Sequence, residues 1–140
     1  MCAYQTGTRT VGGKDFFIGY RKTVLTPEEV VVSVTVPLTK ETEYVELYKQ
    51  ARRREDDIAI VNSCMRVVLA PSDGAAAAPS YVIQDAAFAF GGMAAQTVAA
   101  KHLQQAVLNQ PWNEALIPMV CKQLDLDLPL QPDVPGGMAE

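Results

Sequence analysis

The hydrophobic residues of this chain follow two different periods, and the order of these periods limits the folds open to it. Strict alternation, typical of a half-buried β-strand, runs through residues 30–36 and returns in residues 43–50. Residues 58–69 and 81–90 have the composition and length of two further strands. The short connection at residues 38–42 suits an antiparallel hairpin between the first two strands.

The last third of the chain changes to helical spacing. One helical face carries four apolar residues and ends before Pro111: Ala99, Leu103, Ala106 and Val107. Asn113 is a good N-cap for a second helix that runs to Leu124, and Pro118 in its second turn should kink or delay it. Strands followed by helices predict an α+β fold, in which an antiparallel β-sheet of about four strands has C-terminal helices packed on one face.

The domain organisation predicted from the sequence is simple. Residues 1–13 form a polar, flexible leader without the apolar core of a signal peptide, and residues 14–140 form one domain. The net charge of −4 argues against nucleic acid as a partner. No apolar run approaches the ~20 residues needed to span a bilayer, so no membrane partner is expected.

The metal-binding residue types are few. The three cysteines, Cys2, Cys64 and Cys121, are too far apart for a zinc knuckle and too few for a disulfide framework. Cys64 and Cys121 lie in apolar patterns and are interpreted as buried core residues. His102 is the only histidine and is expected to be exposed, without an evident catalytic partner. The sequence therefore predicts neither a metal site nor catalytic residues.

A charged segment at residues 52–57 is the most unusual feature, with three arginines followed by three carboxylates. It is either a solvated hairpin loop whose charges pair weakly, or a loop that places charge beside a bound cofactor. Lys49 either extends to solvent along apolar surface or contacts a phosphate or flavin. Gly91 and Gly92 are interpreted as turn glycines, because they complete no phosphate-binding motif.

Four stretches resemble the xanthine dehydrogenase/oxidase family. Residues 16–29 are similar to the opening of the C-terminal subdomain of its FAD domain, and residues 48–59 to the charged loop that follows. Residues 91–94 and 133–138 resemble two later landmarks in the right order. The resemblance covers roughly residues 16–138 and implies the fold of the CO dehydrogenase flavoprotein C-terminal domain.

The resemblance also implies site residues. Val31 and Lys49 would contact the flavin, Val31 by apolar contact and Lys49 by its ammonium group. The loop at residues 50–60 would lie beside the isoalloxazine, and Arg53 and Asp56 would set the electric field there. Val31 stands where the family usually has leucine, which is a conservative difference.

The resemblance further implies a parent enzyme that oxidises hypoxanthine and xanthine at a molybdopterin centre. Electrons pass through two [2Fe–2S] clusters to FAD, which reduces NAD+ or O2. Such a parent is expected to be a cytoplasmic homodimer, with the peroxisome as the alternative location. The loop that holds the FAD pyrophosphate, the cluster cysteines and the molybdopterin region have no counterpart in this chain. We therefore expect a fragment that shares FAD with a missing lobe and is inactive alone.

Two alternatives remain open. The first is the equivalent lobe of an aldehyde oxidase, which the resemblance makes less favoured because that family has a less acidic segment where Glu55, Asp56 and Asp57 stand here. The second is a non-catalytic interaction module that keeps the same fold without the cofactor.

Overall fold

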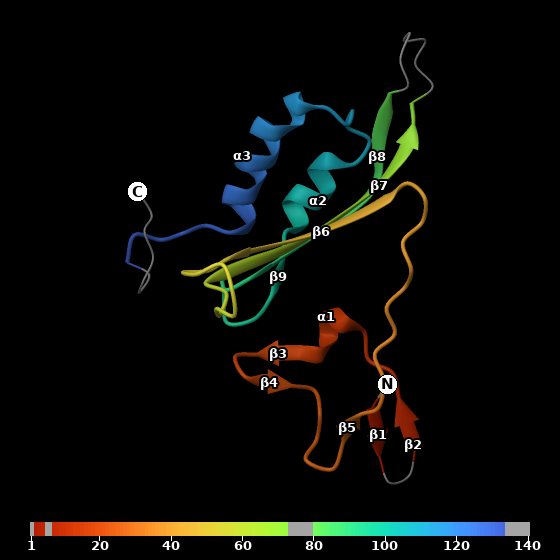
Figure 1. Cartoon of the computed structure of the whole chain (residues 1–140), viewed down its shortest axis with the longest axis vertical. Coiled ribbons are helices and arrows are strands. Elements are labelled where there is room, and N and C mark those ends of the chain that lie inside the picture. Colours follow the sequence, from red (N-terminus) through yellow and green to blue (C-terminus); the bar gives the residue numbers. More distant parts are fainter. Residues whose placement is uncertain (1, 5–6, 73–79, 134–140) are drawn as a thin grey trace.

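The main element of the structure is a four-stranded antiparallel sheet (Figure 1). The computed structural model describes residues 2–4, 7–72 and 80–133. The strands β6 (Glu43–Gln50), β7 (Val61–Pro71), β8 (Tyr81–Gly91) and β9 (Val98–Ala99) lie side by side in chain order. The predicted sheet of about four antiparallel strands is confirmed, although its fourth strand is β9 and not residues 30–36, and Ala99 lies in β9 instead of on the predicted helical face. The predicted bounds of β6 and β8 agree closely with the observed ones.

The register of the sheet assigns each residue to one of two faces. Val67 on β7 lies opposite Tyr44 on β6 and Ala86 on β8. Residues that pair directly across antiparallel strands point to the same face. Val67 and Ala86 are buried under the helices, so the next residue along β7, Arg66, points to the opposite face.

Two C-terminal helices, α2 (Lys101–Val107) and α3 (Ile117–Asp127), pack on one face of the sheet, as predicted (Figure 1). A short 3₁₀ turn, η1 (Glu114–Leu116), precedes α3, and the Asn113 side chain accepts a hydrogen bond of 3.0 Å from the Ala115 N–H. Pro118 therefore lies in the first turn of α3, where its missing N–H leaves no bond unmade. It delays the helix, as the sequence indicated.

The core lies between these helices and strands β7 and β8. A β-bulge after Val68 shifts the register, so that Ile83 as well as Ala86 can face the helices. The buried hydrophobic residues among those described are Val67, Leu69, Ile83, Ala86, Ala100, Leu103 and Val107. No helix in the described ranges is long and apolar enough to cross a membrane.

Asp127, at the end of α3, caps the start of α2. Its carboxylate accepts hydrogen bonds from the backbone N–H groups of His102 at 3.0 Å and Leu103 at 2.8 Å, and it contacts the His102 ring at 2.8 Å. Burial alone would raise the pKa of Asp127, but these hydrogen bonds outweigh it and lower the pKa below 3.8. His102 is exposed, as predicted, and its partner Asp127 could not be identified from local sequence.

The N-terminal part differs most from the prediction. Six short elements occupy it: β1 (Cys2–Tyr4), β2 (Gly7–Arg9), α1 (Gly13–Phe16), β3 (Phe17–Gly19), β4 (Lys22–Thr23) and β5 (Val30–Val31). The leader expected to be flexible instead supplies β1 and β2, which pair with each other, and β1 also pairs with β5.

The predicted strand at residues 30–36 is wrong beyond Val31. The segment that follows has no regular structure, and Val34 and Val36 are 78% and 77% exposed. The predicted hairpin with β6 is also wrong, because β6 pairs with β7. Alternation alone cannot produce a strand where neither a partner strand nor a core is available.

Two smaller predictions have different outcomes. Cys121 is exposed and Cys64 is half-buried, so the interpretation of both as buried core residues is wrong for Cys121 and only partly right for Cys64. The family motif at residues 133–138 falls mostly outside the described residues.

Candidate functional site

The face of the sheet opposite the helices carries a shallow hollow of about 290 Å³. The register places Leu47, Cys64 and Ala89 in one row across three strands, and Lys49 and Asn62 in the next row. The lining is mostly apolar: Leu47, Tyr48, Lys49, Ala59, Asn62, Ser63, Cys64, Ala89 and Thr97. The hollow therefore combines an apolar floor with one ammonium and one amide group.

Lys49 connects this hollow to the charged loop. Its Nζ donates a hydrogen bond of 3.0 Å to the backbone carbonyl of Asp57. The backbone N–H of Ile60 donates to the carbonyl of Gln50 at 2.8 Å and closes the base of the loop. Lys49 thus does not simply extend into solvent, and the loop between β6 and β7 is fixed to the edge of the hollow.

Asp57 organises the loop, a role that the sequence did not predict. One carboxylate oxygen accepts a hydrogen bond of 3.0 Å from the backbone N–H of Arg53, and the other accepts one of 3.1 Å from the N–H of Ile58. The Arg53 guanidinium lies 3.7 Å from the same carboxylate. The spacing of four residues between Arg53 and Asp57 was the available signal, because it brings the two together in a tight turn.

Asp56 is the residue at which the loop reverses. Its φ of 52° lies in the left-handed region, which aspartate tolerates better than most residues. The structure therefore brings three of the predicted site residues, Lys49, Arg53 and Asp56, together at one end of the sheet. Val31 is not among the described residues that line the hollow, and it lies in the separate sheet of β1, β2 and β5 (Figure 1).

The two glycines at the end of β8 allow the backbone to close behind this site. Gly92 has a φ of 84°, and a Cβ there would lie 2.3 Å from the carbonyl oxygen of Ile60. A Cβ on Gly91 would lie 2.5 Å from Oδ1 of Asn62, which lines the hollow. Gly92 therefore needs glycine both for the turn and for close packing against the loop base, whereas a side chain at Gly91 would have to displace the Asn62 side chain.

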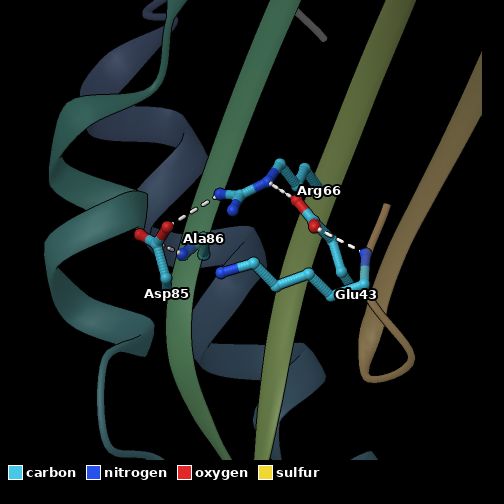
Figure 2. A network of polar contacts seen from close by, with 5 residues as sticks. Glu43, Arg66, Asp85 and Ala86 are labelled. Atoms are coloured by element: carbon cyan, nitrogen blue, oxygen red, sulfur yellow. Dashed lines mark hydrogen bonds and ion pairs between the residues drawn. The ribbon is translucent and has the colours of Figure 1, made fainter. Parts of the chain in front are cut away.

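A polar network continues the same face away from the hollow (Figure 2). Arg66 on β7 donates a hydrogen bond from its Nε to Glu43 on β6 and one of 2.8 Å from its Nη1 to Asp85 on β8. Hydrogen bonds from Arg66 lower the pKa values of both carboxyl groups, and those to Asp85 and Glu43 raise the pKa of Arg66. This network ties three strands together with one cation and two anions.

The donor groups of the hollow decide what it can hold. Among the described residues, no three histidine, cysteine, aspartate or glutamate side chains gather where they could bind a metal ion. An apolar floor with an ammonium and an amide at its rim fits one side of a flat aromatic ring system that has polar edges. The residues present therefore fit a flavin ring, and Leu47, Lys49 and Asn62 are the ones that would hold it.

The comparisons with known proteins agree on one family. Residues 46–140 match the CO dehydrogenase flavoprotein C-terminal domain. The chain is 45% identical over 136 residues to a xanthine dehydrogenase/oxidase of Rattus norvegicus, which covers 96% of this chain and 10% of that protein. It is 39% identical over 135 residues to a xanthine dehydrogenase of Dictyostelium discoideum, covering 94% of this chain and 10% of that protein. The chain thus spans about a tenth of the length of these curated relatives.

Solved structures show the same fold. Carbon monoxide dehydrogenase from Hydrogenophaga pseudoflava superposes with a TM-score of 0.76 at 20% identity, covering 99% of this chain and 44% of that one. Quinoline 2-oxidoreductase from Pseudomonas putida 86 gives 0.72 at 22% identity, covering 95% and 42%. At these identities the likeness concerns the fold alone.

Proposed function

Because the chain belongs to the family of the CO dehydrogenase flavoprotein C-terminal domain, we propose that it is the lobe of a xanthine dehydrogenase that completes one side of the FAD site. The observation that carries the proposal is the fixed geometry of Lys49 and the charged loop around one apolar hollow. The similarity to xanthine dehydrogenases, at 39–45% identity over most of this chain, selects that enzyme class.

In this proposal, the residues of the chain position the flavin and control access to it. Lys49 directs its ammonium toward the polar edge of the ring, while the apolar floor excludes water from one side. Arg53 and Asp56 set the field beside the ring, since a nearby cation favours anionic flavin forms and an anion disfavours them. The bound flavin would accept electrons from xanthine oxidation in the parent and pass them to NAD+ or O2. Val31 is proposed as an apolar contact that depends on the second lobe.

The proposal makes Asp57 a positioning residue. It holds the backbone of Arg53 and Ile58, and its own carbonyl holds Lys49. Loss of its carboxylate would release the loop without removing any group proposed to contact the flavin. A substitution of Asp57 should therefore change the ratio of NAD+ reduction to O2 reduction more than it changes the amount of bound FAD.

The first test is whether FAD binds to the 140-residue chain alone, followed by flavin absorbance after gel filtration. We expect no retained FAD, because one side of a cofactor site lacks most of the preorganised contacts that provide affinity. Retention of stoichiometric FAD would contradict the shared-site proposal.

The second test replaces the matching segment of the rat enzyme with this chain. We expect the chimera to retain FAD and to form NADH from xanthine. Lys49→Met should lower the affinity for FAD about tenfold, as expected for loss of a hydrogen bond from a charged group. Lys122→Met is the matched control, because Lys122 is exposed on α3 and far along the chain from the loop. Equal losses in both variants would refute the role of Lys49.

The same chimera separates the alternatives. Oxidation of xanthine with O2 but with no NADH formed would favour the aldehyde oxidase lobe. A folded chimera that never retains FAD would favour a non-catalytic module with this fold.

A further inference from the structure

The helix-bearing face of the sheet is only partly covered. The core residues lie on β7 and β8, under α2 and α3, whereas the residues of the edge strand β6 that share this face are exposed: Tyr44, Glu46 and Tyr48. Tyr44 is 55% and Tyr48 59% exposed. Large aromatic side chains in such positions commonly mark a contact surface.

These side chains form one wall of a groove of about 520 Å³. The segment between the helices forms the other wall, where Trp112 and Ile117 are 50% and 59% exposed. The floor between the two walls is apolar and includes Val67, Ile83, Phe88 and Val107. Three of these, Val67, Ile83 and Val107, are core residues, so the groove reaches down to the core.

The charged side chains that line the groove are all negative. Among the described residues that line it, Glu46 and Glu114 are the only charged ones, one on each wall, and none is a lysine, arginine or histidine. No hydrogen bond or ion pair between described residues involves either of these two carboxylates. By contrast, the Glu43, Asp85 and Asp127 carboxylates are all satisfied within the fold. The groove therefore has two unused acceptors above an aromatic and aliphatic floor.

We propose that this groove binds a polypeptide segment of the parent enzyme that carries apolar side chains and at least one arginine or lysine. The inference rests on the proposed function, since the chain spans about a tenth of its relatives and the rest of the parent supplies the segment. Apolar side chains would fill the floor, and the cation would lie between the two carboxylates and against the rings of Tyr48 and Trp112. The groove lies on the helix-bearing face of the sheet, opposite the hollow proposed to hold the flavin. The parent segment would therefore bind one face of the lobe while the other face contacts the cofactor.

The test uses the chimeric rat enzyme with the photo-reactive substitution Trp112→p-benzoylphenylalanine, which places the probe on the groove wall. Irradiation followed by peptide mapping should give a cross-link to a parent segment outside the grafted residues. That segment should contain apolar residues and an arginine or lysine within about one helical turn. Neutralising both acids, Glu46→Gln with Glu114→Gln, should reduce the cross-link yield about fivefold, in the range of two partly exposed ion pairs.

The matched control is Glu41→Gln with Asp125→Asn, which makes the same charge change at two exposed residues outside the groove. It should leave the yield unchanged. The absence of any cross-link, a cross-linked segment without a basic residue, or an equal loss in the control would each overturn the groove proposal. NADH formation from xanthine by the same chimera reports on the flavin site separately. An active chimera without the cross-link would overturn only this inference, and a chimera without FAD would overturn the proposed function as well.

Discussion

The two ends of the chain are stabilised by different means. All the buried hydrophobic residues in the described part of the chain lie between Val67 and Val107, in the sheet and helices of the C-terminal region. Residues 7–42 contain none, and their strands are two or three residues long. The C-terminal region therefore has its own core, while the N-terminal region depends on local polar contacts and short strand pairs.

One ion pair shows how the N-terminal region is held. Arg9 on β2 pairs with Glu29 at 2.6 Å and donates a further hydrogen bond of 2.8 Å to the carbonyl of Val24. Glu29 also accepts a bond of 2.8 Å from the Thr26 N–H. Exposed polar contacts of this kind contribute little free energy compared with a hydrophobic core. The difference implies that the C-terminal region is the cooperative unfolding unit and that the N-terminal region opens independently.

The largest expected effect tests the core directly. Ile83→Ala should lower the free energy of unfolding by about 2–5 kcal/mol, because Ile83 is 1% exposed and its truncation leaves a cavity beneath α2. Urea unfolding followed by far-ultraviolet circular dichroism measures this. A loss below about 1 kcal/mol would mean that the C-terminal region has no dominant core and does not differ from the N-terminal region in this respect.

The second effect concerns the turn that follows β8, beside the hollow proposed to hold the flavin. Gly92→Ala should cost about 1–3 kcal/mol, since its φ of 84° and its contact with the Ile60 carbonyl both exclude a side chain. Gly13→Ala is the control, because its Cβ would meet no atom within 4 Å. Equal stability of both variants in urea would show that the N-terminal and C-terminal glycines are under the same constraint.

The same division between the regions explains what the sequence could predict. The bounds of β6, predicted from alternation, and of β8, predicted from composition and length, agree closely with the structure because both strands have partner strands and Ile83 and Ala86 are buried. The valine alternation at residues 30–36 was just as regular, yet it yields a strand only at Val30 and Val31. Local pattern states which residues could form a strand, but pairing and burial depend on residues distant in the chain.

The site followed the same rule. Lys49, Arg53 and Asp56 lie in one continuous motif, so the sequence alone places them close together, while their role beside a flavin stays a prediction. The organising role of Asp57 depends on where its two oxygens point, and the tie between Asp127 and His102 joins residues 25 positions apart. The Arg53–Asp57 contact is signalled only by its spacing of four residues, and the Asp127–His102 contact has no signature in local spacing.

A third, smaller effect concerns the contact between the two helices. Asp127→Asn should cost about 1 kcal/mol at neutral pH, because an amide can accept at one atom only and leaves one N–H of α2 without its acceptor. The pKa of Asp127 is lowered in the folded chain, so its ionised form stabilises the fold above about pH 4 and that contribution is lost as the pH falls below 3.8. The difference between wild type and variant in urea should therefore shrink in acid. A difference that is constant with pH would contradict an ionic contribution.

The fourth effect should be visible in the N-terminal region only. Glu29→Gln removes the partner of Arg9, whose hydrogen bond is the main cause that lowers the pKa of Glu29 to about 2. We expect trypsin to cleave after Arg21 and Lys22 severalfold faster at neutral pH, with the urea midpoint unchanged. Glu28→Gln, one residue away and exposed, is the control. A shift of the urea midpoint in Glu29→Gln would show that the two regions unfold together.

The smallest effect is expected where the sequence prediction failed. Val34→Thr and Val36→Thr should each change the free energy of unfolding by less than about 0.5 kcal/mol, because both side chains are more than three-quarters exposed. A buried valine would respond differently, since a hydroxyl placed in a core without a partner costs more than that. Val67→Thr, on the helix-bearing face of β7, supplies this contrast within the same chain. If all three substitutions cost the same, Val34 and Val36 would be packed in solution. The N-terminal region without a core would then end before Val34.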